Sequence, residues 1–157
     1  MPHGRNKLNT SSSQFEESSP DIEMYLNSEL TILKHALDEH AIVIVADFAG
    51  NIIEVNDKFC VISGYERAEI MGKNHKFVKS NEQSDAVFVD VWKTISSGHT
   101  WYGDIKNTNK TGGDYWVRMT IVPTLDDKGK PLQYVGICVE ITDRKQAESL
   151  EKSRTHI

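Results

Sequence analysis

The sequence predicts an α+β fold, in which a five-stranded antiparallel sheet carries short helices on one face and an amphipathic helix precedes it. Three observations predict this fold. Two apolar segments in residues 41–56 flank a turn-forming cluster, which is typical of a hairpin. Helical patterns fill most of residues 57–97, and three strand-like segments follow in residues 101–141. Strands grouped before and after a run of helices favour an antiparallel sheet.

Length and composition restrict the class of protein. The chain has 157 residues, 38% of them hydrophobic, and a net charge of −5, which suits one soluble domain with tails. The sequence contains no basic stretch long enough to bind nucleic acid, which argues against DNA or RNA partners. The two cysteines lie far apart, without metal-ligand spacing, so we expect no disulfide framework and a reducing, cytoplasmic location. No apolar run approaches the ~20 residues that span a bilayer, so we expect no membrane contact by this chain.

The first elements follow from local signals. Residues 1–19 are polar and rich in serine, which predicts a disordered tail. Residues 20–40 predict a cap helix, because Pro20 suits a first helical position and leucines recur at helical spacing: Leu26, Leu30, Leu33 and Leu37. Strands are expected at 41–46 and 52–56, joined by the turn at 47–51.

The remaining elements continue this order. Short helices are expected at 57–62 and 66–71, separated by Ser63-Gly64, and a longer helix at 84–97 is closed by Gly98. Strands follow at 101–109, 115–124 and 133–141, and a polar connector helix occupies 143–157.

The last strand has two different faces. One face is uniformly apolar, with Val135, Ile137, Val139 and Ile141, and the other holds Tyr134, Gly136, Cys138 and Glu140. We expect the uniformly apolar face to lie outside any pocket and to need a cover. The leucine stripe of the N-terminal helix is the available partner, in the same chain or in a second copy.

An aromatic window suggests a ligand. All three tryptophans, Trp92, Trp101 and Trp116, fall within 25 residues that also contain Asn107. Aromatic side chains interleaved with amides suit a flat heterocycle with a polar edge, such as a flavin. The alternative is that the tryptophans are ordinary core residues. Tyr115 and Trp116 alternate, so only one can face inward, and we expect Trp116 on the exterior.

Six short motifs follow one another along the chain: Asp47-x-x-Gly50-x-Ile52, Val55-Asn56-x-x-Phe59, Ser63-Gly64-Tyr65, Glu69-Ile70-Met71-Gly72, Gly112-Gly113-x-Tyr115-Trp116-Val117 and Glu140-Ile141-Thr142-Asp143-Arg144. This ordered series resembles the PAS domain family over residues 33–145. The resemblance implies a PAS sensor domain at residues 41–142. It also implies a signalling module rather than an enzyme.

Within that family, the chain looks most similar to the FAD-binding redox branch of the aerotaxis receptor and the nitrogen-fixation flavoprotein regulators. That resemblance implies FAD contacts by Asn56, His75, Phe88, Trp92, Trp101 and Asn107. Lys79 stands where the aerotaxis receptor has arginine, so it is expected to meet the diphosphate only as a point charge. Light-oxygen-voltage photoreceptors carry a reactive cysteine where this chain has His75, which predicts that adduct photochemistry is absent.

The resemblance therefore implies a flavin-based redox or oxygen sensor. FAD would be held without a covalent bond, and its redox state would alter the sheet and the flanking helices. The partners implied are a second copy bound through the N-terminal helix and an output domain or signalling protein. Two alternatives remain open from the residues: a cofactor-free interaction domain in which the aromatics only pack, and a haem or light sensor.

Overall fold

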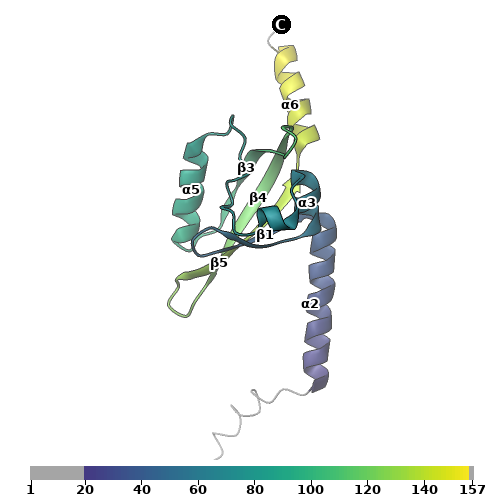
Figure 1. Cartoon of the computed structure of the whole chain (residues 1–157), viewed down its shortest axis with the longest axis vertical. Coiled ribbons are helices and arrows are strands. Elements are labelled where there is room, and N and C mark those ends of the chain that lie inside the picture. Colours follow the sequence, from purple (N-terminus) through teal and green to yellow (C-terminus); the bar gives the residue numbers. More distant parts are fainter. Residues whose placement is uncertain (1–19, 156–157) are drawn as a thin grey trace, which may run out of the picture. The chain divides into compact units, whose positions relative to one another are not determined.

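The computed structural model describes residues 20–155, which contain one five-stranded antiparallel sheet in the order β2-β1-β5-β4-β3 (Figure 1). Its strands are β1 (Ile42–Asp47), β2 (Ile52–Val55), β3 (Trp101–Thr108), β4 (Asp114–Leu125) and β5 (Pro131–Glu140). Between β2 and β3 the chain forms α3 (Asp57–Ser63), α4 (Arg67–Ile70) and α5 (Asp85–Ser96). The predicted fold class is confirmed. The tail predicted at residues 1–19 lies outside the described residues.

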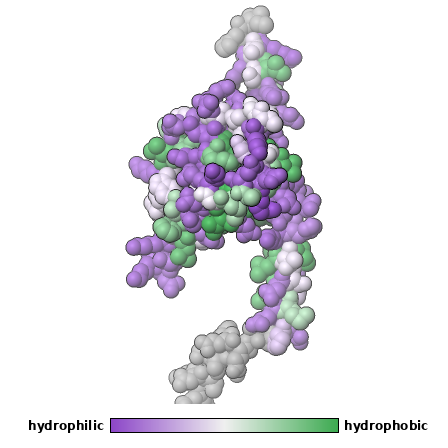
Figure 2. All heavy atoms as spheres, in the orientation of Figure 1, coloured by the Kyte–Doolittle hydropathy of each residue, from purple (hydrophilic) through white to green (hydrophobic). Residues whose placement is uncertain are grey.

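The chain divides into two compact units between Ala36 and Leu37, and each is described by itself. Most of α2 (Pro20–His40) belongs to the first unit, and the predicted N-terminal helix is present with these bounds. Its apolar side chains are exposed, and Figure 2 shows them among hydrophilic ones along the helix: Ile22, Met24, Tyr25, Leu26, Leu30, Ile32 and Leu33. Among the helices of residues 20–155, none is long and apolar enough to cross a membrane.

The core of the second unit lies between the helices and one face of the sheet. On β5, Tyr134 and Cys138 are buried there with Phe59 of α3 and Val91 of α5. Burial also raises the pKa of the Cys138 thiol to about 12, so this sulfur is held in its unreactive protonated form. The opposite face of β5 is less covered, and Val139 is 50% exposed. The two faces predicted from the alternation are therefore observed.

Two glycines shape the elements around the core. Gly98 follows α5 with φ 90°, as expected of a residue that closes a helix in the left-handed region. Gly103 lies on β3 directly under the ring of Trp101, because both residues face the core and are two positions apart. The absence of a side chain at Gly103 lets the indole lie flat against the strand.

Candidate functional site

The inner face of the sheet and α5 enclose a cavity of about 40 Å³. Its walls are mainly apolar, and three polar side chains are among the residues that line it: His75, Asn107 and Tyr134. The remaining lining comes from every strand except β2, from α5 and from two loop positions: Ile44, Ala46, Gly50, Val78, Phe88, Ile95, Ile105, Met119, Ile121 and Gly136. An apolar enclosure with a few placed polar groups is the usual form of a small-molecule site.

A cleft of about 230 Å³ lies next to this cavity. It is lined by Ala49, Asn74, His75, Lys76, Phe88 and Trp92. His75 and Phe88 line both spaces, and their ring centroids are 6.2 Å apart, so these two rings form the partition between cavity and cleft. Together the two volumes approach the lower end of the roughly 300–1,000 Å³ typical of ligand pockets.

His75 is fixed to the β1–β2 turn by Gly50. The Gly50 carbonyl accepts a bond from the His75 backbone N–H at 3.2 Å and lies 3.3 Å from Nδ1 of the ring. The other ring nitrogen, Nε2, is buried without a hydrogen-bond partner among residues 20–155. Burial lowers the pKa of this imidazole, the Gly50 contact opposes that change, and Lys76 adds to it. The ring is therefore neutral at pH 7.

Asn107 reaches the cavity from β3 and is 6% exposed. Its register partner across the sheet is Tyr115 on β4, which is also buried. Trp116, the next residue, points to the other face of β4, as predicted. The Nζ atom of Lys145, in α6 (Thr142–Thr155), lies 4.8 Å from the centre of the Trp116 ring.

The family model for the PAS domain matches residues 39–143. This chain belongs to the PAS domain family. Its PAS domain is 34% identical over 110 residues to the aerotaxis receptor of Escherichia coli (strain K12), covering 70% of this chain and 22% of the relative. It is 28% identical over 98 residues to a nitrogen fixation regulatory protein of Klebsiella oxytoca, covering 62% and 20%. This chain thus spans about a fifth of these relatives.

Solved structures show the same fold. An RNA-binding light-oxygen-voltage receptor superimposes with a TM-score of 0.70 at 21% identity, over 81% of this chain and 37% of that one. The light-state light-oxygen-voltage domain of the blue-light photoreceptor Aureochrome1 gives 0.64 at 19% identity, over 76% and 96%. At these identities the likeness shows the PAS fold alone. PAS domains serve as sensory modules in signalling proteins.

The chemistry of the PAS cavity fits a flat heterocycle with a polar edge. An imidazole, an amide and a phenol offer both donors and acceptors, while the other walls give apolar contact. The volume fits only in part. A cavity of about 40 Å³ has room for very few waters, and a three-ring heterocycle needs several times that space. A ring of that size would enter only if the His75–Phe88 partition moved toward the cleft.

Of the three other aromatic residues predicted to contact the cofactor, Phe88 and Trp92 line the cavity or the cleft and Trp101 does not. Phe88 is buried and lines both spaces, whereas Trp92 lines only the cleft and is 39% exposed. Trp101 lies outside both described linings. Its Nε1 donates to Asp90 Oδ2 at 2.9 Å, so this indole ties β3 to α5. Trp101 therefore lies in the structure as an ordinary core residue, which is the alternative that the sequence left open.

Lys79 also lies outside both linings. Its Nζ atom is 2.7 Å from Asp85 Oδ1, and this hydrogen bond lowers the pKa of the Asp85 carboxyl. The backbone of Lys79 bridges to Asn107. The lysine that does line the cleft is Lys76, three residues earlier. Sequence reasoning did not select Lys76, because spacing alone does not tell which of two nearby lysines is already paired.

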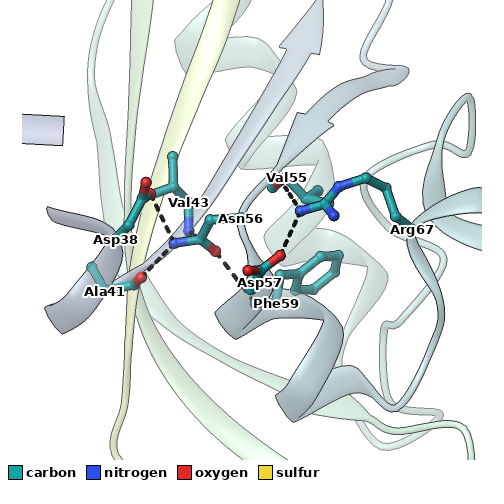
Figure 3. Close-up of polar contacts among 8 residues, drawn as sticks. All are labelled: Asp38, Ala41, Val43, Val55, Asn56, Asp57, Phe59 and Arg67. Atoms are coloured by element: carbon teal, nitrogen blue, oxygen red, sulfur yellow. Dashed lines mark hydrogen bonds and ion pairs between the residues drawn. The ribbon is translucent and has the colours of Figure 1, made fainter. Parts of the chain in front are cut away.

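Asn56 joins three elements (Figure 3), and it is not among the residues that line the cavity. Its Oδ1 accepts from the backbone N–H of Val43 at 3.0 Å and of Phe59 at 3.3 Å, which caps α3. Its Nδ2 donates to the Ala41 carbonyl at 2.8 Å and to Asp38 Oδ1 at 3.2 Å. All four contacts are within the protein, so we leave Asn56 out of the cofactor contacts proposed below.

The start of α6 is attached to the outer side of β4 and β3. The backbone N–H of Trp116 donates to Thr142 Oγ1 at 3.0 Å, and its carbonyl accepts from Ile141 at 2.8 Å. Lys145 Nζ lies 3.1 Å from Asp104 Oδ2. Arg118 pairs with the same carboxylate, and its hydrogen bond is the main reason that the pKa of Asp104 is lowered. Trp116 thus contacts α6 directly.

Two further residues shape the site. Tyr134 was predicted to face inward, and it does line the cavity, but the sequence did not select it as a site residue; burial raises the pKa of this phenol. Gly50 has φ 90°, and a side chain there would meet both the His75 ring and the Trp92 ring at 3.4 Å. The turn motif in the sequence marks Gly50 as a bend, and only the fold shows that it also gives the partition its space.

Proposed function

We propose that this PAS domain is a redox or oxygen sensory module of bacterial signal transduction that binds FAD without a covalent bond. The observation that carries the proposal is the set of three polar side chains, His75, Asn107 and Tyr134, that line an otherwise apolar enclosure. The resemblance to the FAD-binding branch supports the same cofactor. A bound flavin would supply a ring whose charge and hydrogen-bonding groups depend on its redox state.

We assign the cofactor contacts by where the side chains lie. Asn107, His75 and Phe88 would meet the ring, since they line the cavity. Lys76 and Trp92 would meet the phosphate-bearing tail in the cleft, since both line it. We assign the phosphate contact to Lys76 and not to Lys79, because Lys79 is already paired with Asp85 and must break that contact to bind a phosphate.

Output would pass from the cavity to α6 through adjacent residues of β4. Tyr115 pairs with Asn107 on the inner face, and Trp116 contacts α6 on the outer face. Leaving one buried polar group unpaired costs about 1–3 kcal/mol. A redox-dependent hydrogen bond to Asn107 would therefore shift a two-state arrangement of α6 by about 5- to 150-fold. The receiver would be an output domain or a separate signalling protein.

The leucine stripe of α2 would form a homodimer contact in this proposal. Leu30→Glu places a charge in the middle of the stripe, and we expect it to convert dimer to monomer, because a buried unpaired carboxylate is costly. Ser28→Glu adds the same charge to a different side of the helix and should leave the dimer intact. Sedimentation equilibrium measures both. A monomeric wild-type protein would remove the dimer from the account.

The cofactor assignment is tested at Asn107. Asn107→Leu keeps the side-chain size but removes the amide, and we expect flavin affinity to fall at least tenfold, about 1.4 kcal/mol. Asn81→Leu, at an exposed loop position, should bind flavin like the wild type. Fluorescence quenching of added FAD gives the dissociation constants. Unchanged affinity in a folded Asn107→Leu protein would show that the ring lies elsewhere.

A further inference from the structure

The protonation of the His75 ring can be read from its contact with Gly50. A carbonyl oxygen only accepts hydrogen bonds, so Nδ1, 3.3 Å from the Gly50 carbonyl, carries the hydrogen. In a neutral imidazole the second nitrogen is then an acceptor. Nε2 therefore presents a lone pair, and it is buried without a partner among the described residues.

A buried acceptor is unfavourable unless it receives a hydrogen bond from a donor. The penalty is about 1–3 kcal/mol, and native proteins keep few such atoms. His75 also lines the cavity and forms half of the partition, so a molecule entering from the cleft must pass this ring. Among residues 20–155, the groups that shift its pKa are Gly50 and Lys76, the ring packed on it is Phe88, and none of these is acidic.

We propose that His75 is a specificity-determining residue whose Nε2 recognises an N–H donor on the edge of the bound heterocycle. The proposal rests on the proposed function for the identity of the ligand. The oxidised isoalloxazine ring has a single ring N–H, that of its imide, and this group is therefore the donor that His75 selects. The Gly50 carbonyl acts as the positioning group, because it fixes which nitrogen of His75 is free to accept.

The tautomer is measured directly by ¹⁵N NMR of the imidazole nitrogens. We expect Nδ1 of His75 to be protonated in the protein alone and after addition of riboflavin, which has the ring without a phosphate. Nε2 should stay unprotonated and shift toward the values of a hydrogen-bonded acceptor when riboflavin binds. A protonated Nε2 in either sample would overturn the proposal.

Two substitutions separate the two nitrogens of His75. His75→Gln places a carbonyl near the position of Nε2, and we expect riboflavin affinity to stay within about threefold of the wild type. His75→Asn can still donate to the Gly50 carbonyl but does not reach the cavity, and we expect affinity to fall about tenfold or more. Equal affinities for the two folded variants would contradict the assignment of Nε2.

The donor on the ligand is tested with riboflavin methylated at the imide nitrogen. The wild-type PAS domain should bind riboflavin at least about tenfold more tightly than this derivative, and His75→Asn should lose most of that preference. Binding of riboflavin without any preference would overturn the role of His75 while leaving the flavin proposal intact. No binding of either riboflavin or FAD at any concentration tested would remove both.

The neutral state of His75 has a consequence for stability. Because burial lowers its pKa from 6.5 in the folded protein, the unfolded chain binds more protons at this residue below about pH 6.5. The free energy of unfolding should therefore fall as the pH drops through that range, and more steeply in the wild type than in His75→Gln. Urea unfolding at pH 7.5 and pH 5.5 measures the difference. Parallel pH profiles would show that His75 becomes charged in the fold.

Discussion

Replacing Asn56 with alanine should lower the free energy of unfolding of this PAS domain by about 3 kcal/mol. Loss of a helix N-cap alone costs about 1 kcal/mol, and each buried group left unpaired adds about 1–3 kcal/mol. Here the substitution removes the cap of α3 and also strips partners from Val43 N–H and the Ala41 carbonyl (Figure 3). Urea unfolding followed by circular dichroism measures the change.

A second variant separates capping from the rest of this contact set. Asn56→Asp retains the oxygen that accepts from Val43 and Phe59. It replaces the Nδ2 donor, which faces Asp38 and the Ala41 carbonyl, with a second carboxylate oxygen. We expect it to be destabilised as well, by repulsion from Asp38. Asn81→Ala, at an exposed position, is the control and should change little. Wild-type stability in Asn56→Ala would show that these bonds contribute nothing.

Gly103→Ala should destabilise the domain by about 2–3 kcal/mol through overpacking. A Cβ atom at this position overlaps the end of the Trp101 ring and lies 2.7 Å from its Cζ2 atom. The ring is 8% exposed and belongs to the core, so it has little room to move away. Any shift also strains the hydrogen bond from Trp101 Nε1 to Asp90, which ties β3 to α5. Thermal unfolding gives the size of the effect.

The matched control is Gly136→Ala in β5. A Cβ atom there lies 3.7 Å from the Ile44 carbonyl oxygen and 3.9 Å from Ile44 Cβ, which are ordinary contact distances. Its stability should stay within about 0.5 kcal/mol of the wild type, because a strand glycine gains from a side chain wherever space allows. Equal stability of Gly103→Ala and Gly136→Ala would show that Trp101 does not pack flat on β3 as the structure describes.

Much of the fold follows from periodicity in the sequence. The alternation along β5 predicts which residues face the core, and Tyr134, Gly136 and Cys138 are indeed the buried set. Gly98 ends α5 as expected. Local patterns do not give strand order, because the pairing of β5 with both β1 and β4 is a long-range choice that depends on the whole core. Local patterns also leave the ends of helices and strands uncertain. For example, β2 ends at Val55 because Asn56 turns to cap α3.

The sequence predicts the site less fully than it predicts the fold. The resemblance selected Phe88, His75 and Asn107, which the fold brings together at one cavity. It also selected Lys79 and Trp101, whose polar atoms are already occupied by Asp85 and Asp90. Such pairing depends on side-chain positions across different elements, and residue type at a given spacing does not encode it. The unpaired nitrogen of His75 is likewise a property of the fold, since it depends on the Gly50 carbonyl.

The central claim is that a flavin occupies the cavity and the cleft next to it. The most direct measurement is acid extraction of the protein, purified without added cofactor, followed by chromatography of the released material and an absorption spectrum of the intact protein. The account predicts FAD in stoichiometric amount and a flavin spectrum that Asn107→Leu loses. A colourless extract from soluble, folded protein, or a Soret band in place of the flavin bands, would contradict it.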